Sequence, residues 1–154
     1  MKPAVHLRDV EPDDLPIFFE HQRDPDATRM AAFPVRDEAA FMAHWHKILR
    51  DTSNKTKSIL FDGAVVGNIA SFVVLGQREV GYWIGKEYWG KGIATGALAA
   101  LLDIESTRPL YAHVAKHNIG SRRVLEKCGF TVVSEDSFTE DDGTHVEEYL
   151  LKLD

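Results

Sequence analysis

Apolar side chains recur along the chain at two periods, which separate predicted helices from predicted strands. Residues 38–49 place apolar side chains at helical spacing directly after Asp37, a residue type that favours helix N-caps. Residues 57–84 are instead rich in Val, Ile, Phe, Tyr and Trp, with interruptions at Asp62-Gly63 and Gly76-Gln77, which predicts an antiparallel meander. In chain order, the predicted elements are strand 5–10, a turn and N-cap at 11–14 followed by a helix to about residue 20, helix 38–49, strands 57–61, 64–75 and 79–84, helix 95–104, strand 110–115, helix 118–127 and strands 130–133 and 146–153.

This order of elements predicts an α/β fold, with a mixed sheet that carries helices on its faces. The 154 residues have the length of a single domain, which we assign to residues 1–154 because they contain no repeat and no low-complexity linker. Asp24-Pro25-Asp26 is expected to break the chain between the first two helices, and Gly129 is expected to end the last helix.

The composition narrows the class of protein. The net charge of −6 argues against a nucleic-acid partner, because phosphate binding usually requires a basic face. Cys128 is the only cysteine, so there is no internal disulfide, which is typical of a reducing compartment. No window approaches the ~20 apolar residues of a membrane span, and residues 1–8 lack the apolar core of a signal peptide. We therefore expect a cytoplasmic protein without a membrane partner.

The sharpest local signal is the run Gly90-Lys91-Gly92-Ile93-Ala94-Thr95, between a predicted strand and a helix of small residues. A helix start leaves backbone N–H groups unpaired and partly positive, and glycines let phosphates approach that backbone. The run is therefore a candidate phosphate cradle, although glycines can also serve only to make a tight turn. A P-loop requires Ser or Thr where Gly92 stands, and a dinucleotide fingerprint requires Gly where Thr95 stands, so both are excluded.

Around this run the chain resembles the GNAT acetyltransferases. Their motif Q/R-x-x-G-x-G/A is matched at Gly92 and Ala94, while Trp89 replaces the leading Gln or Arg. The Trp-Gly-x-Gly form is similar to the branch that contains the ribosomal-protein N-terminal acetyltransferases (RimJ/RimL-type). A second motif of that branch, N-x-x-S followed by L-E-K-x-G-F, is matched by residues 118–121 and 125–130.

The resemblance implies a GNAT fold, in which a mostly antiparallel sheet of about seven strands splays between strands 4 and 5 and about four helices flank it. It implies transfer of an acetyl group from acetyl-CoA to a primary amine, either a protein N-terminus or a small molecule, by direct attack in a ternary complex. A homodimer is common in this family. The alternative that stays open is a non-catalytic acyl-CoA-binding or sensing module of the same fold.

The resemblance also implies which residues hold the cofactor. Backbone N–H groups of the glycine run would bind the pyrophosphate, and the pantetheine arm would pair with the fourth strand like an added strand. Arg122 or Arg123 would reach the adenosine 3′-phosphate, although each is also an ordinary surface arginine of a helix. The implied cofactor-binding residues are Trp83, Ile84, Gly90, Lys91, Gly92, Ala94, Thr95 and Asn118.

Glu79, Ser121 and Asn118 are the candidate catalytic residues. Glu79 would act as a base through a water, while Asn118 and Ser121 share one helix face beside the reacting sulfur. Many GNAT enzymes carry a Tyr general acid one helical turn after Ser121, where this chain has Leu125, so Ser121 or water would substitute. Two plainer interpretations remain: Glu79 as an exposed strand-end carboxylate paired with Arg78, and Asn118 as a helix N-cap.

The acceptor amine is not specified by the sequence. An α-amino group has a pKa near ~8 and is roughly a tenth neutral at pH 7, whereas a lysine-like amine near ~10.4 is under about a thousandth neutral. A base therefore matters more for the second class. Selectivity is expected from residues 22–36 and 137–145. Four large apolar residues either shape the acceptor pocket or belong to the core: Met30, Phe33, Phe41 and Trp45.

No metal is predicted. His44 and His46 are two residues apart on a predicted helix, so they point to different sides and cannot form the usual i, i+4 metal pair. His113 either lines the cleft or is an ordinary strand histidine. Cys128 is expected to be a small residue at the edge of the core, not a nucleophile.

Overall fold

Seven strands form one mixed sheet in the computed structural model, which describes residues 4–31 and 36–154. The strands are β1 (Val5–Asp9), β2 (Lys55–Phe61), β3 (Ala64–Val74), β4 (Gln77–Ile84), β5 (Leu110–Ala115), β6 (Thr131–Thr139) and β7 (His145–Leu153). The helices are α1 (Leu15–Arg23), α2 (Pro25–Ala31), α3 (Glu38–Arg50), α4 (Ile93–Ile104) and α5 (Ile119–Lys127), with short 3-10 helices η1 (Pro12–Asp14) and η2 (Lys86–Tyr88). The predicted mixed α/β fold is confirmed.

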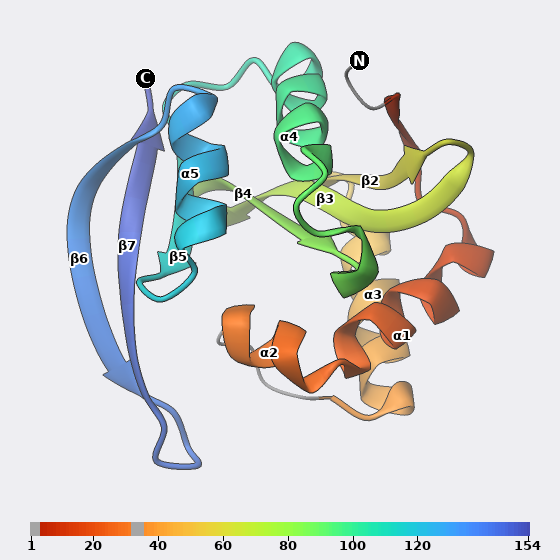
Figure 1. The fold of residues 1–154 in the computed structure, drawn as a ribbon, viewed down its shortest axis with the longest axis horizontal. Coiled ribbons are helices and arrows are strands. Elements are labelled where there is room, and N and C mark those ends of the chain that lie inside the picture. Colours follow the sequence, from red (N-terminus) through yellow and green to blue (C-terminus); the bar gives the residue numbers. More distant parts are fainter. Residues whose placement is uncertain (1–3, 32–35) are drawn as a thin grey trace.

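The sheet consists of two antiparallel halves that meet at one place (Figure 1). Its strand order is β1-β2-β3-β4-β5-β7-β6, and only β4 and β5 run parallel to each other. A single bridge, between Glu79 and Tyr111, joins these two strands. Beyond that bridge they separate, so the expected splay between the fourth and fifth strands is confirmed.

Helices cover both faces of the sheet (Figure 1). On one face, Leu98 and Leu101 of α4 and Leu125 of α5 join the large buried cluster formed with the strands. On the other face, α1 and α3 form a second cluster around Phe18 and Phe41. Each such side chain contributes roughly 1.5–3 kcal/mol when it is fully buried, so the two clusters fix the helices against the sheet.

A fifth helix, α2, stands where the sequence predicts a break at Asp24-Pro25-Asp26. The Asp24 carboxylate accepts hydrogen bonds from the backbone N–H groups of Asp26 (2.9 Å) and Ala27 (3.3 Å). Pro25 occupies the first helical position, where its missing N–H costs nothing. The break therefore ends one helix and starts the next.

The strand β6 is longer than predicted. The sequence pattern supports only residues 130–133, because the following residues are polar and exposed on both faces. The backbone ladder nevertheless continues to the pair Thr139–His145 against β7. Pairing with a partly buried neighbouring strand thus supplies the order that the side-chain pattern of β6 does not predict.

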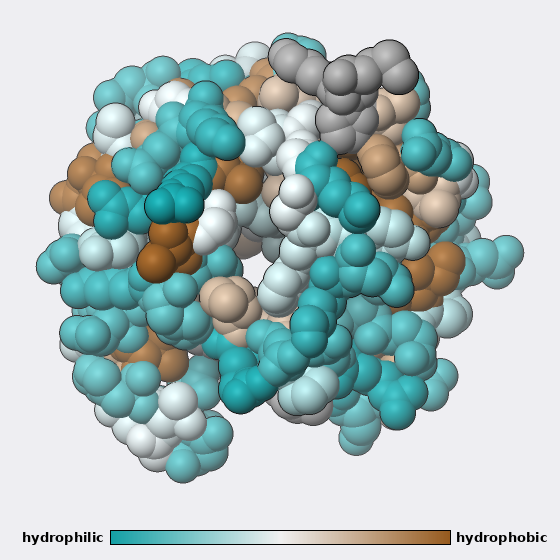
Figure 2. Space-filling view, viewed as in Figure 1, coloured by the Kyte–Doolittle hydropathy of each residue, from teal (hydrophilic) through white to brown (hydrophobic). Residues whose placement is uncertain are grey.

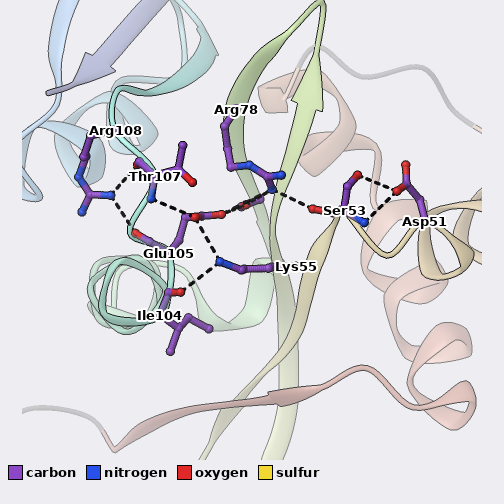
Figure 3. A network of polar contacts seen from close by, with 9 residues as sticks. Asp51, Ser53, Lys55, Arg78, Ile104, Glu105, Thr107 and Arg108 are labelled. Carbon is purple, nitrogen blue, oxygen red and sulfur yellow. Dashed lines mark hydrogen bonds and ion pairs between the residues drawn. The ribbon is translucent and has the colours of Figure 1, made fainter.

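The C-terminal end of α4 is anchored by Glu105, whose side chain is 1% exposed (Figure 3). Its carboxylate accepts hydrogen bonds from Ser71, from Lys55 (3.2 Å) and from the backbone N–H of Thr107 (3.2 Å), and it lies 3.5 Å from Arg78. Burial raises the pKa of Glu105, but these bonds outweigh burial and hold the pKa at about 2. The network ties α4 to β2, β3 and β4.

Candidate active site

The junction between β4 and α4 is an open helix start. Gly90 and Gly92 both have positive φ angles, of 76° and 78°, a conformation that other residues adopt only with strain. A Cβ atom built on either glycine would meet no atom within 4 Å. Gly92 is the N-cap of α4, and no side chain among the described residues caps it. The space beside both glycines at the start of α4 is therefore open, as an anion site at a helix N-terminus requires.

The edge of β4 that faces the gap carries backbone groups that no neighbouring strand pairs, although the Ile84 carbonyl accepts from the Trp89 side chain. The amide of Gly85 donates to β3, and pairs alternate along an antiparallel ladder, so Trp83 is hydrogen-bonded to Asn68. The backbone groups of Tyr82 and Ile84 consequently point towards β5, where no ladder forms beyond the bridge at Glu79.

Trp89, which replaces the family's Gln or Arg, has a structural role. Its indole N–H donates to the carbonyl of Ile84 over 2.9 Å. This bond ties the loop that carries Gly90 to the end of β4. Trp89, the residue that departs from the family motif, therefore anchors the start of the glycine run.

A cavity of ≈ 810 Å³ lies between the two sheet halves and continues under α1 and α3. Figure 2 shows the molecule hollowed near its centre, between the part with α5 and β5–β7 and the part with α1–α4. Residues of β3, β4, β5, β6, β7, α1, α3 and α5 line this cavity. It therefore connects the face that holds α5 with the face that holds α1 and α3.

Glu79 lies in this cavity, buried to 6% exposure, with Oε1 2.7 Å from Nδ1 of His113. On the other side of the imidazole, Nε2 lies 3.9 Å from a carboxylate oxygen of Glu148. The interpretation of Glu79 as an exposed carboxylate paired with Arg78 is wrong. Arg78 instead bonds Ser71 (2.8 Å) and the anchor at Glu105.

The charge balance around His113 is negative. Burial raises the pKa of Glu148, and the carboxylates of Asp136 and Glu79 raise it further, while His113 lowers it. Glu79, Glu148 and Asp136 come from β4, β7 and β6, three strands that are separated in sequence. The fold thus gathers anions around one imidazole, an arrangement that stabilises a cation placed there.

Ser121 and Tyr82 meet at the other end of the gap. The hydroxyl of Tyr82, on β4, lies 2.7 Å from the Ser121 hydroxyl, on α5. Burial raises the pKa of Tyr82 to about 12, despite its bond to Ser121. Asn118 caps α5, since its side-chain oxygen accepts from the Ser121 amide over 3.2 Å. Both Asn118 and Ser121 also line the cavity.

The sequence does not identify Tyr82 as the tyrosine whose hydroxyl contacts Ser121. Leu125, at the position where many GNAT enzymes carry Tyr, lies in the core with 2% exposure. A tyrosine hydroxyl instead reaches Ser121 from the neighbouring strand. Alternation puts Tyr82 on the same face of β4 as Val80 and Ile84, but its partner Ser121 follows only from the packing of α5 on that face.

The chamber under α1 and α3 has an aromatic wall. Phe41 and Trp45 belong to the buried cluster and also line the cavity, so both interpretations of these residues apply. Gln22, 8% exposed, also lines it, and its Nε2 has no hydrogen-bond partner among the described residues. Met30 does not line the cavity, and Phe33 lies outside the described residues.

The remaining candidates lie around the cleft or at its rim. Arg122 pairs with Glu126 (3.2 Å) and lies over the Tyr149 ring, whereas Arg123 is exposed. Lys91 is exposed beside the glycines. Burial raises the pKa of the Cys128 thiol, which disfavours the reactive thiolate. Of the two arginines, Arg123 is thus the more exposed.

Within residues 4–31 and 36–154, no group of three or more His, Cys, Asp or Glu side chains is arranged to hold a metal ion. None of the helices in this part of the chain has both the length and the apolar character needed to cross a membrane.

Comparison with known proteins agrees with this geometry. YdaF of Bacillus subtilis (strain 168), provisionally named a ribosomal N-acetyltransferase, is 34% identical over 94 residues, which cover 56% of this chain and 51% of YdaF. The chain thus spans about half the length of that relative. An uncharacterized N-acetyltransferase of Bacillus licheniformis, p20, is 24% identical over 137 residues, 80% of this chain and 77% of p20.

A solved structure has the same fold. Spermidine N-acetyltransferase from Vibrio cholerae, crystallised with CoA and spermine, superposes with a TM-score of 0.83 at 18% identity, covering 97% of this chain and 94% of that one. The sequence model of the family described as the acetyltransferase (GNAT) domain matches residues 4–131. This match covers most of the chain, including the glycine run and the α5 motif, and it confirms the resemblance. The chain belongs to the GNAT acetyltransferase family.

Proposed function

We propose that the protein is an N-acetyltransferase that moves an acetyl group from acetyl-CoA to a primary amine by direct attack in a ternary complex. The observation that carries this proposal is the open start of α4, which leads into a gap between β4 and β5 and from there into the cavity. A diphosphate held at the helix start would direct a thioester along the gap towards Ser121 and Glu79.

The chain's own groups fit a CoA thioester. The amides of Gly90, Lys91, Gly92, Ala94 and Thr95 would receive the pyrophosphate. The pantetheine arm would pair with the gap-facing backbone of Tyr82 and with the amide of Ile84, one residue to either side of Trp83. Asn118 would border the same arm, and Arg123 would reach the 3′-phosphate.

Polar groups of the chain lie on both the thioester side and the amine side of the proposed reaction. Acetyl-CoA supplies an acyl group activated as a thioester. A backbone N–H of β4 beside the gap would stabilise the oxyanion. The Ser121 hydroxyl, oriented by Tyr82, would protonate the departing sulfur. Glu79 and its partner His113 lie on the amine side, where they would accept the proton of the attacking nitrogen.

The acceptor chamber fits a cationic amine. Glu79, Glu148 and Glu140 line it together with aromatic side chains. Carboxylates attract an ammonium group and an apolar wall covers its carbon substituents, so both an α-amine and a longer amine remain compatible with the chamber. The non-catalytic alternative is not favoured, because the relatives are named as N-acetyltransferases and a buried carboxylate–imidazole pair lies in the cavity.

The first prediction tests the cradle with a matched pair of variants. Gly92→Val places a branched side chain where the phosphates would lie, and it strains the positive φ of 78°. Gly63→Val carries the same kind of strain, at φ 82° in an open turn far from the cleft. We expect calorimetry to show at least a tenfold loss of acetyl-CoA affinity for Gly92→Val alone, and similar losses of stability for both.

Wild-type protein is expected to bind acetyl-CoA but not ATP, and to release thiol from acetyl-CoA over a panel of primary amines. Equal acetyl-CoA affinity in wild type and Gly92→Val would exclude the glycine run as the phosphate-binding site. Binding without thiol release for any amine would leave the sensing module as the function.

A further inference from the structure

The two side chains of the Glu79–His113 pair differ in their exposure, which the sequence did not reveal. The carboxylate of Glu79 is almost fully buried, and its Oε1 is engaged by Nδ1 of His113 at 2.7 Å. The His113 side chain is 43% exposed and lines the cavity. Of the two side chains, only the imidazole of His113 is open to the cavity, whereas the Glu79 carboxylate is buried. We propose that His113 is the catalytic base and that Glu79 is a positioning residue, an inference that rests on the proposed function.

The geometry sets the tautomer of the imidazole. An ionised carboxylate can only accept a hydrogen bond, so Nδ1 of His113 must carry the proton that it shares with Glu79. In the neutral ring, Nε2 then has a lone pair. The nearest carboxylate oxygen on that side, from Glu148, is 3.9 Å away, beyond hydrogen-bond distance. Nε2 is therefore left as the acceptor for a proton from the amine or from one intervening water.

The surroundings stabilise the charge that this base acquires. Glu79 faces the ring from β4, Glu148 from β7, and Asp136 of β6 lies near Glu148. The groups that line the same cavity from the β6–β7 turn and from the α3 side are Glu140, Arg36, His44 and Asp51. The carboxylates of Glu79 and Glu148 thus lie on opposite sides of the ring, one facing each ring nitrogen.

A proton passes from the ammonium nitrogen of the acceptor to Nε2 of His113, and the lone pair released on that nitrogen attacks the thioester carbonyl carbon. As the C–N bond forms and the C–S bond breaks, the sulfur leaves with the electron pair. It takes up the second nitrogen proton through the Ser121 hydroxyl. The products are an acetamide and a free thiol, and His113 returns its proton to solvent.

The kinetic test compares His113→Gln, Glu79→Gln and the control His46→Gln, which changes an exposed histidine of α3. General-base loss costs roughly 10²–10⁴-fold, so we expect His113→Gln to lower kcat/KM at pH 7 by at least 100-fold. Acetyl-CoA affinity should not change. The deficit should shrink towards tenfold as the pH approaches the range where the acceptor amine itself becomes neutral. His46→Gln should match wild type.

Glu79→Gln removes the anion but keeps the shape of the side chain. The positioning role predicts a smaller loss, of about tenfold, with the acidic limb of the kcat/KM–pH profile retained and moved to lower pH. The proposal is overturned if Glu79→Gln abolishes that limb while His113→Gln retains it. A His113→Gln deficit that is the same at every pH would also overturn it.

A spectroscopic test does not depend on turnover. Two-dimensional ¹⁵N–¹H NMR should show neutral His113 with its proton on Nδ1, and Glu79→Gln should weaken this preference, because the amide oxygen is a poorer acceptor than a carboxylate. If the proton lies on Nε2 in wild type, the base assignment fails even when acetyl transfer is observed. If the proton lies on Nδ1 but no amine is acetylated, the proposed function fails while the geometry of the pair stands.

Discussion

At the scale of the residue, Gln22 has a side-chain amide that is buried without a partner among the described residues. Leaving a buried donor unsatisfied costs about 1–3 kcal/mol. Because Gln22 lines the chamber next to the aromatic wall, an acceptor with an oxygen near its amine would satisfy that donor. The unpaired amide is thus a candidate determinant of the acceptor.

Gln22→Leu should therefore weaken acceptor binding selectively. We expect the acceptor KM to rise about tenfold, the value of one neutral hydrogen bond, while acetyl-CoA affinity and folding stability are retained or improved. Gln77→Leu, at the exposed first position of β4, is the matched control. Steady-state kinetics with the best amine of the panel provides the measurement, and an unchanged KM would exclude Gln22 from acceptor binding.

Single residues differ in how far the sequence reveals them. Gly92 and Asn118 act through local backbone conformation, so a short motif was sufficient to single them out. The bond between Glu79 and His113 joins residues 34 apart, from strands that touch only at one bridge. No spacing rule encodes that contact. The only sequence signal is that His113 alternates with the apolar core positions of its strand.

At the scale of the element, α4 has opposite conditions at its two ends. Its N-terminus is open to a ligand, whereas its C-terminus is anchored by Glu105 to three strands (Figure 3). The pKa of Glu105 is lowered to about 2, so this anchor stabilises the fold above pH 4.5 and is lost as the pH falls through 2. The hydrogen bond from Arg8 also lowers the pKa of Asp14 to about 2. Asp14 therefore stabilises the fold over the same pH range.

Glu105→Gln should accordingly lower the free energy of unfolding at pH 7 by about 2–3 kcal/mol. The difference from wild type should shrink below about 1 kcal/mol near pH 2, because protonation removes the same charge from the native protein. Urea denaturation between pH 2 and pH 7 measures this. Glu20→Gln, in an exposed pair with Arg23, should differ little from wild type at any pH. A constant difference for Glu105→Gln would contradict the charge assignment.

Elements with a regular pattern were predictable, and the two exceptions have physical reasons. Asp24 and Pro25 begin α2, although the same residue types also signal the end of a helix, because Asp favours N-caps and Pro is tolerated only in the first helical turn. The second half of β6 is stabilised by its ladder with β7 rather than by an apolar face, so its polar sequence reads as a loop.

At the scale of the whole molecule, ligand binding should complete the sheet. Acetyl-CoA bound along the gap would pair with the β4 amides of Tyr82 and Ile84, which point away from β3, but not with Trp83, which β3 already engages. At about 100 times the Kd, binding to the native state adds about 2.7 kcal/mol of stability.

Hydrogen exchange measured by NMR should detect this pairing residue by residue. With saturating acetyl-CoA we expect exchange at Tyr82 and Ile84 to slow at least tenfold more than exchange at Trp83, and ATP at the same concentration should have no such effect. Slowing at Trp83 alone would mean that the arm lies on a different edge, and the proposed register of the pantetheine would be wrong.

The single bridge between Glu79 and Tyr111 has a mechanical consequence. One bridge resists rotation less than a ladder does, so the two sheet halves can pivot about this point as a long substrate arm enters or leaves. Displacement is smallest at a pivot and grows with distance from it. Since Glu79 is itself at the bridge and His113 lies two residues beyond it, the distal end of the gap can widen while the proton-transferring pair stays in register.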